Sequence, residues 1–332
     1  MLLPAPPHRN RPEAHLYPRP IPEVSEQTIR IENPLAGDDG LPVFWRSAPS
    51  PPGTPVPLYL HGVPSNSDEW IAPQDHHGKK PLWKRWWRAK VSGDEWVEPG
   101  RPGSGFLERS GGLAPDLPGF GRSGKPGSFQ YTIDEYADFI ERFLDELEVE
   151  RVSLLVHDWG SVGLTFAQRH PERVARLAIV NAVPFLPGYS WHRTARIWRS
   201  PGLGELAMGA TNRLTLGPLS KESNVTPGPM PNYWLDNILD HFDQGTQRAI
   251  LRLYRSSPSE VLAAHGLDLG RLEMPALIAW GMRDPYIPSR FAKEYAEALP
   301  NAELLELEDA GHWPWLDRPD LIGRLTDFLG GG

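Results

Sequence analysis

Val152-Ser153-Leu154-Leu155-Val156-His157-Asp158-Trp159-Gly160-Ser161 is the stretch of this 332-residue sequence that decides its fold. The run 152–156 is apolar apart from one serine, which is typical of a short strand buried on both faces. Helical spacing begins at Val162, so Asp158 stands between the end of a strand and the start of a helix. The stretch predicts a tight turn that presents Asp158 at the carboxyl edge of a parallel sheet. An Asp in this place is also a common helix N-cap.

The same pattern continues in both directions along the chain. Short apolar runs bounded by turn residues predict further strands at 56–60, 113–117, 177–180, 276–280 and 304–307. Helical spacing predicts helices over 136–147 and 162–169, the first preceded by a capping box of Thr132 and Glu135. Alternating strands and helices predict an α/β fold, with a mostly parallel sheet flanked by helices.

Three segments interrupt this alternation and divide the chain. Residues 1–22 are proline-rich and predict an extended tail. Residues 184–268 are rich in Trp, Tyr and Arg with helical patterning, and they predict a helical cap inserted into a core of 23–183 and 269–332. Residues 72–105 hold four Trp among many basic residues and form an atypical insertion, interpreted as a tolerated loop rather than a lid.

The composition excludes several kinds of chemistry. The chain contains no cysteine, which rules out disulfides, thiolate zinc sites and a cysteine nucleophile. Its net charge of −8 disfavours nucleic acid and anionic membranes as general partners. No apolar run reaches the roughly 18 residues of a membrane span, and MLLPAPPHRNRP lacks the apolar core of a secretory signal. We therefore expect a cytoplasmic protein without membrane or nucleic-acid partners, and the dispersed His and carboxylates predict no metal site.

Two more chemically capable residues follow predicted strands. Asp284 comes after the run 276–280 in Gly-Met-Arg-Asp, and His312 comes after 304–307 in Ala-Gly-His-Trp. A histidine at the sheet edge can act as a base near neutral pH, and a carboxylate can orient it. Taken singly, Asp284 is equally a turn residue and His312 a packed histidine. The joint order of acid, acid and histidine, each just beyond a strand, favours a catalytic group with Asp158 as nucleophile.

Several short sequence motifs at the turns of this chain resemble those of a known superfamily. They are HGVP at 61–64, DLPGFGRSGKP at 116–126, HDWGS at 157–161, GMRD at 281–284 and GHWPW at 311–315. Together they resemble the α/β-hydrolase superfamily, and HDWG resembles its aspartate-nucleophile branch of epoxide hydrolases and haloalkane dehalogenases. The resemblance covers about 28–71 and 106–330, and the insertion 72–105 lies outside it.

The resemblance implies a role for each matching residue. Asp158 attacks an sp³ carbon to form an alkyl ester, His312 activates the water that hydrolyses the ester, and Asp284 supports His312. Backbone N–H groups of Val63 and Trp159 form an oxyanion hole. The reaction needs no organic cofactor and no metal.

The two branches differ in the group that stabilises the leaving atom. Leu253-Tyr254-Arg255 resembles the motif around the ring-opening tyrosine of epoxide hydrolases. Val63 stands where many dehalogenases have a halide-binding Asn, and this difference also favours the epoxide hydrolase branch. Trp198 instead occupies the place of the second cap tyrosine, where it is a possible halide donor; Tyr189 and Tyr233 are candidates for the missing phenol. Residues expected to contact the substrate are His61, Trp159, Tyr189, Trp198 and Trp313.

These features favour hydrolysis of a small apolar epoxide to a diol, with Tyr254 as proton donor. A haloalkane dehalogenase that uses the same three residues is the alternative hypothesis. A non-catalytic binding protein on the same fold is a further alternative, because a fold does not fix a function.

Overall fold

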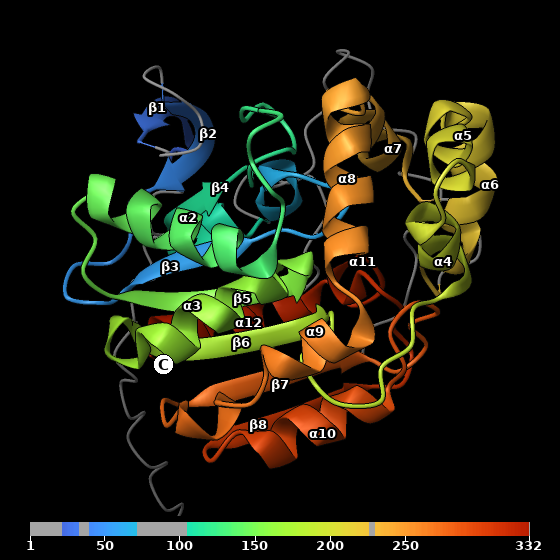
Figure 1. The fold of residues 1–332 in the computed structure, drawn as a ribbon. Coiled ribbons are helices and arrows are strands. Elements are labelled where there is room, and N and C mark those ends of the chain that lie inside the picture. The colour runs from blue at the N-terminus through green and yellow to red at the C-terminus, as the bar shows by residue number, and fades with distance from the viewer. Residues whose placement is uncertain (1–21, 33–39, 72–104, 226–229, 332) are drawn as a thin grey trace, which may run out of the picture.

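A single mixed sheet forms the centre of the computed structural model, which describes residues 22–32, 40–71, 105–225 and 230–331. The eight strands lie in the order β1-β2-β4-β3-β5-β6-β7-β8 (Figure 1). Their bounds are β1 Ser25–Ile31, β2 Leu41–Ala48, β3 Val56–Leu60, β4 Gly112–Pro115, β5 Val152–Asp158, β6 Val174–Ala182, β7 Ala276–Gly281 and β8 Ala302–Leu307. The pairings β1–β2 and β2–β4 are antiparallel, and the pairings from β4 to β8 are parallel.

Helices cover both faces of this sheet because its central strands are apolar on both sides. Successive residues of a strand point to opposite faces: Leu154 packs in one core cluster and Leu155 in the other. The first cluster includes residues of α2 Ile133–Glu146, α3 Val162–Arg169 and α10 Arg290–Ala298. The second includes residues of α1 Phe106–Ser110, α11 Pro314–Asp317 and α12 Asp320–Gly330. The result is a helix–sheet–helix sandwich (Figure 1).

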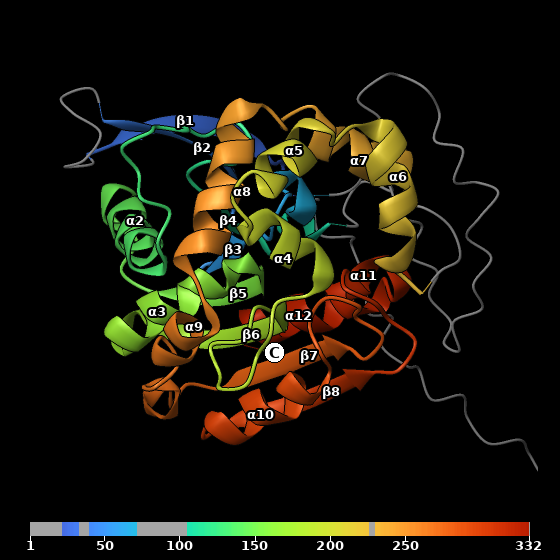
Figure 2. The same cartoon turned by 45° about the vertical axis from the view of Figure 1, so that its right-hand side comes forward.

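Between β6 and β7 the described chain forms a series of helices. They are α4 Arg193–Arg199, α5 Leu203–Gly209, α6 Arg213–Leu219, α7 Asn232–Leu239, α8 Gln244–Ser256 and α9 Ser259–Ala264. We call α4–α8 the cap helices; they gather on one side of the sheet in both views (Figures 1 and 2). Tyr254 of α8 contacts Trp159, which directly follows β5, so the cap helices approach the carboxyl end of the central strand.

Each strand expected from an apolar run is present, with small differences at the ends. The expected run 113–117 is too long, because β4 ends at Pro115. Sequence patterning missed β1, whose residues are mostly exposed and therefore form no apolar run. It also missed β2, which is mostly buried but whose apolar residues are interrupted by Pro42, Arg46 and Ser47. The predicted tail and insertion lie, apart from residues 22 and 105, outside the described residues.

The capping box predicted before α2 is only half formed. Thr132 Oγ1 accepts a hydrogen bond from the backbone N–H of Glu135 at 3.2 Å, as expected of an N-cap. The Glu135 carboxylate, however, accepts from the N–H groups of Gln130 and Tyr131 rather than from Thr132. Tyr131 has a positive φ of 58°, and this turn brings the two earlier N–H groups to the carboxylate.

Gly160 gives a test of how tightly the central turn is packed. A Cβ at this position would lie 2.2 Å from the Leu60 carbonyl oxygen, so Gly160→Ala must push β3 and β5 apart. We expect a loss of roughly 1–3 kcal/mol in the free energy of unfolding, measured by urea denaturation.

Gly209→Ala is the matched control for this variant. Gly209 lies on the exposed surface of α5 and a Cβ there would meet nothing within 4 Å. Replacing a helical glycine by alanine stabilises a helix by about 0.5–1 kcal/mol. Equal stabilities for the two variants would contradict the packing described for the turn.

Candidate active site

A strained turn presents Asp158 at the end of β5. Its backbone has φ 48° and ψ −117°, a conformation that L-residues rarely adopt. The turn is possible because glycines stand on both sides: a Cβ on Gly62 would lie 2.5 Å from Asp158 Cβ, and Gly160 lies against Leu60. The chain then continues into α3, so the Asp158 side chain stands at the carboxyl edge of the sheet, as the sequence predicts.

Backbone N–H groups bond to the Asp158 carboxylate. The Val63 N–H donates to Oδ1 at 2.8 Å, and the Trp159 N–H also bonds to the carboxylate. Burial raises the pKa of Asp158, and the charge of His312 with these N–H groups opposes part of that rise. The two N–H groups lie where the sequence expected an oxyanion hole, and here they hold the ground-state carboxylate.

His312 lies on the other side of Asp158 and is oriented by Asp284. His312 Nδ1 lies 2.7 Å from Asp284 Oδ2, and His312 Nε2 lies 3.6 Å from Asp158 Oδ2. Because the ionised Asp284 only accepts hydrogen bonds, the Nδ1 of His312 carries a proton. In neutral His312 the lone pair of Nε2 therefore faces Asp158 and the space beside it.

The Asp284 carboxylate has a full set of hydrogen-bond donors. Oδ1 accepts from the N–H groups of Tyr286 and Ile287, and Oδ2 accepts from the Asn181 amide at 2.7 Å as well as from His312. Burial would raise the pKa of Asp284, but the His312 charge and these bonds outweigh burial and lower it.

The same contact acts on His312 in the opposite direction. Burial would lower the pKa of His312, but the charge and hydrogen bond of Asp284 outweigh burial and raise it. The structure therefore brings together Asp158, His312 and Asp284 from three loops that are distant in sequence.

Aromatic side chains from the cap side gather around Trp159, the residue that follows Asp158. Trp159 stacks on Trp191 with ring centroids 5.4 Å apart, and Tyr254 meets Trp159 edge-on at 5.1 Å. Trp198 in turn meets Tyr254 edge-on at 5.0 Å. The resulting surface is apolar, with the polar atoms of these side chains at its edges.

The Tyr189 hydroxyl is a buried donor at this surface with no hydrogen-bond partner among the described residues. The Trp159 indole N–H has no well-directed partner there either, but it lies close enough to the Tyr254 hydroxyl to oppose part of the rise in the pKa of that phenol. Burial and the negative charge of Asp158 raise the pKa of both Tyr189 and Tyr254, so both phenols keep their protons near neutral pH. Buried polar groups are normally paired, so the Tyr189 hydroxyl is open to a further partner.

Two residues expected to contact the substrate are instead used within the protein. The ring of His61 bonds through Nδ1 to the Gly62 carbonyl and through Nε2 to the Leu117 N–H, at 2.8 and 2.9 Å. The indole N–H of Trp313 donates to Glu69 at 3.1 Å. Both side chains are buried and already hydrogen-bonded within the protein, and their contact with a substrate stays a prediction. Their partners lie far away in sequence, which is why the sequence did not reveal them.

Sequence reasoning also missed residues that shape the site. Asn181 bonds to Asp284, and Trp191 stacks on Trp159, with its own N–H donated to the Ser257 carbonyl at 3.0 Å. Neither residue lies in a recognisable sequence motif. Asn181 is the polar residue next to the end of the buried strand β6, which is the one signal that could have drawn attention to it. Tyr233, once a candidate phenol, lies on α7 and packs on Trp234.

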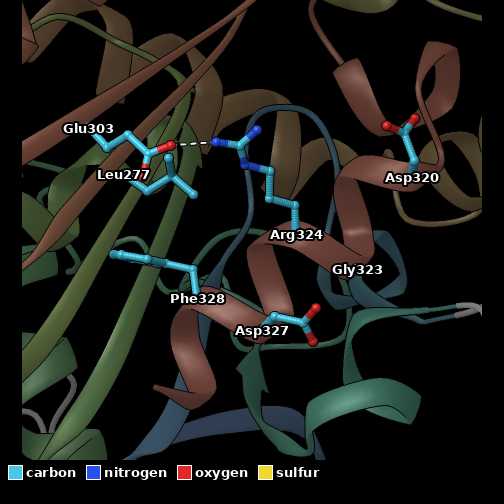
Figure 3. Close-up of a pocket in the computed structure, with 7 residues that line it drawn as sticks. All are labelled: Leu277, Glu303, Asp320, Gly323, Arg324, Asp327 and Phe328. Carbon is cyan, nitrogen blue, oxygen red and sulfur yellow. Dashed lines mark hydrogen bonds and ion pairs between the residues drawn. The ribbon is translucent and has the colours of Figure 1, made fainter. Parts of the chain in front are cut away.

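A separate pocket of about 490 Å³ lies between α12 and the strands β7 and β8 (Figure 3). It is lined by Leu277, Glu303, Asp320, Gly323, Arg324, Asp327 and Phe328. None of these residues belongs to the group around Asp158, and Arg324 is paired with Glu303. Within the described ranges we find no group of three or more His, Asp or Glu placed to hold a metal ion. The helices described there also include none long and apolar enough to cross a membrane.

Comparison with known proteins agrees with this architecture. The family model for the alpha/beta hydrolase fold matches residues 92–319. The chain belongs to the α/β-hydrolase fold family. Within that family it falls in the aspartate-nucleophile, haloalkane dehalogenase-like branch, because its curated relatives include several haloalkane dehalogenases.

Three similar proteins illustrate the place of the chain in this family. A haloalkane dehalogenase from Mycobacterium marinum is 34% identical over 248 residues, covering 65% of this chain and 74% of the relative. A cis-3-alkyl-4-alkyloxetan-2-one decarboxylase from Shewanella oneidensis is 29% identical over 238 residues, covering 65% and 73%. The crystal structure of haloalkane dehalogenase DbeA from Bradyrhizobium elkani superposes with a TM-score of 0.70 at 22% identity, covering 93% and 98%. The structural match shows a shared fold.

The Asp284–His312 contact predicts a measurable change in titration. Asp284→Asn removes the charge that raises the pKa of His312 and leaves the burial that lowers it. The imidazole of His312 should therefore titrate at lower pH in the variant than in the wild type, as followed by NMR of labelled histidine.

Asp138→Asn is the control, because Asp138 is an exposed α2 carboxylate that pairs with Arg169 and Arg142. This change should leave the titration of His312 in place. An unchanged His312 titration in Asp284→Asn would show that the two side chains are not paired in solution.

Proposed function

We propose that this α/β-hydrolase opens epoxides by means of a covalent ester on Asp158. The observation that carries the proposal is the placement of Asp158 between two backbone N–H donors and a carboxylate-supported histidine. The strained turn and the burial of the Asp158 carboxylate both lower the stability of the fold. Such a cost fits a nucleophile better than a helix cap, since the Asp158 side chain makes no capping hydrogen bond.

The first step is attack on the epoxide carbon. The Val63 N–H binds Oδ1 of Asp158, so Oδ2, on the side of His312, is the oxygen free to attack. A carbon–oxygen bond forms to the carboxylate and the strained ring bond breaks. The leaving alkoxide takes a proton from the phenol of Tyr254, which burial keeps protonated.

The second step is hydrolysis of the ester. Neutral His312 takes a proton from water through Nε2, and the resulting hydroxide attacks the ester carbonyl. The N–H groups of Val63 and Trp159 then stabilise the oxyanion. When the intermediate collapses, the diol leaves with the proton from His312. The proton left on the Asp158 carboxyl returns to Tyr254 through solvent, so the net reaction adds one water.

The supply of phenol protons favours an epoxide as the substrate. An alkoxide leaving group needs a proton, and Tyr254 and Tyr189 are buried phenols close enough to Asp158 to feel its charge. One relative is named for an oxetan-2-one, another strained oxygen ring. The aromatic wall of Trp159, Trp191 and Trp198 fits a small, neutral, apolar molecule.

Release of halide from a haloalkane is the second candidate function. It is supported by the buried indole N–H of Trp159, which has no well-directed partner among the described residues, and by the haloalkane dehalogenases among the relatives. A halide leaves as a stable anion and needs N–H donors rather than a proton. Trp198 would supply the second donor, since the Trp191 N–H is already bound to a carbonyl.

Variants of Asp158 and His312 separate the two chemical steps. Asp158→Asn keeps a side chain that tolerates a positive φ but removes the nucleophile, so turnover should be lost while the melting temperature changes little. His312→Gln should form the ester and fail to hydrolyse it. Mass spectrometry of this variant should then find the substrate mass added to the peptide that carries Asp158. Absence of an adduct would refute the two-step mechanism.

A paired assay decides between the two substrates. Purified protein is given styrene oxide, with diol measured, and 1-bromobutane, with bromide measured. We expect diol, and a loss of roughly 10²-fold in its rate of formation in Tyr254→Phe. Tyr233→Phe, on α7, should behave like the wild type and serves as the control. Bromide without diol would overturn the epoxide proposal and support dehalogenation.

A further inference from the structure

A second acid–histidine pair lies directly behind the proposed catalytic group. Glu69 belongs to the short turn Ser67–Trp70 that follows the HGVP loop, and His157 is the residue before Asp158. Both side chains are completely buried, and His157 Nδ1 lies 2.5 Å from Glu69 Oε1. The mechanism proposed above uses neither residue.

The surroundings of His157 determine where its protons lie. Nδ1 faces the Glu69 carboxylate, and Nε2 lies 2.9 Å from the main-chain carbonyl oxygen of His312. A carbonyl can only accept a hydrogen bond, so Nε2 carries a proton. The remaining question is whether the proton between Nδ1 and Glu69 belongs to the imidazole or to the carboxyl group.

The neighbours of Glu69 place that proton on the imidazole. Three further donors point at the carboxylate: the Gly62 N–H at 3.3 Å, the Ser65 hydroxyl at 2.5 Å and the Trp313 indole N–H at 3.1 Å. A group surrounded by donors is most stable as an ionised, acceptor-only carboxylate. Burial would raise the pKa of Glu69, but the charge of His157 and the bonds from His157 and Ser65 outweigh burial and lower it.

We infer that Glu69 and His157 form a buried carboxylate–imidazolium pair that positions the nucleophile and the base. Glu69 joins the HGVP loop to the loop of His312 through its three hydrogen bonds, and to β5 through the close ion-pair contact with His157. Through Nε2 the His157 cation fixes the main chain of His312, and the two rings lie 5.0 Å apart. Neither residue reaches the substrate, so both are positioning residues; this part of the inference rests on the proposed function.

The pair also places a fixed positive charge next to Asp158. The His157 charge opposes the rise that burial causes in the pKa of Asp158. The other titratable groups that face Asp158 are His312 from the loop after β8, Tyr286 from the loop after β7, and Tyr189 and Tyr254 from the cap side. Asp284 and Glu69 face the two histidines. The positive charge of His157 is adjacent to Asp158, whereas the negative charge of Glu69 lies on the far side of His157. Loss of both charges therefore removes more attraction than repulsion and should make Asp158 harder to ionise.

The protonation state can be measured without any substrate. In wild-type protein with ¹⁵N-labelled histidine, both ring nitrogens of His157 should resonate as protonated nitrogens near neutral pH. The signal is assigned by its loss in His157→Gln. In Glu69→Gln the amide can donate to Nδ1, so His157 should become neutral, with one protonated nitrogen. A wild-type His157 with an unprotonated Nδ1 would overturn the inference, whatever the enzyme does.

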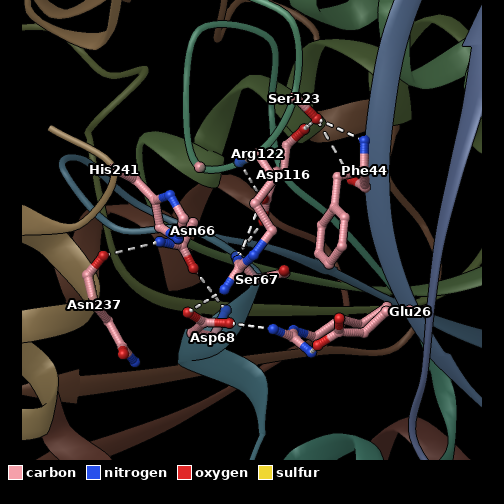
Figure 4. A network of polar contacts seen from close by, with 12 residues as sticks. Glu26, Phe44, Asn66, Ser67, Asp68, Asp116, Arg122, Ser123, Asn237 and His241 are labelled. Carbon is pink, nitrogen blue, oxygen red and sulfur yellow. Dashed lines mark hydrogen bonds and ion pairs between the residues drawn. The ribbon is translucent and has the colours of Figure 1, made fainter. Parts of the chain in front are cut away.

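The effect on the nucleophile is read from the pH dependence of ester formation. Glu69→Gln should shift the acid limb of that rate to higher pH. The control is Asp68→Asn, which removes the neighbouring buried carboxylate from a network with Arg46 and Arg122 outside the site (Figure 4). Asp68→Asn should lower the free energy of unfolding and leave the acid limb in place. Equal shifts in both variants would mean that Glu69 acts only on stability.

The two readouts keep the inference separate from the proposed function. If no ester forms on Asp158 in the His312→Gln variant, the proposed function fails while the histidine spectrum still tests the ion pair. If the ester forms but His157 is neutral in the wild type, the ion pair fails and the mechanism stands. If Glu69→Gln does not fold, the wild-type spectrum alone decides.

Discussion

Burial of a negative charge at Asp158 is the constraint on which the rest of the structure depends. A carboxylate away from water favours protonation, and a protonated carboxyl group is a poor nucleophile. The protein opposes this with N–H groups from Val63 and Trp159 on one side and histidine rings on the other. The same burial excludes water, which makes each of these interactions stronger than it would be at the surface.

Meeting this constraint requires loops from distant parts of the chain to approach very closely. The parallel order β3-β5-β6-β7-β8 ends these strands at one edge, so the residues that follow them meet there. Glycine permits the approach: a Cβ on Gly62 would clash with Asp158, and one on Gly281 would lie 2.0 Å from the Gly311 carbonyl oxygen. The buried Glu69 then holds the assembled loops in place through hydrogen bonds, which suits an arrangement that must not reorganise during catalysis.

How far the sequence predicts this structure depends on the range of the interactions involved. Buried parallel strands such as β5 could be predicted because they are continuous apolar runs. The place of Asp158 followed from the end of β5, and that of His312 from its position in the loop after β8. The mostly exposed β1 gave no such signal. The partners of His61 and Trp313 could not be predicted, because each is set by a contact across the fold. The stacking of Trp191 on Trp159 likewise depends on how the cap side packs, which no local pattern specifies.

The oxygen that Asp158 transfers gives the most direct test of covalent catalysis at this site. Enzyme in excess over epoxide is allowed a single turnover in water labelled with oxygen-18, and the diol and the peptide containing Asp158 are analysed by mass spectrometry. Attack of water on the ester carbonyl predicts an unlabelled diol and a label in the Asp158 carboxyl group. A labelled diol from the first turnover, with Asp158 unlabelled, would mean that water attacks the substrate directly and would contradict the role assigned to Asp158.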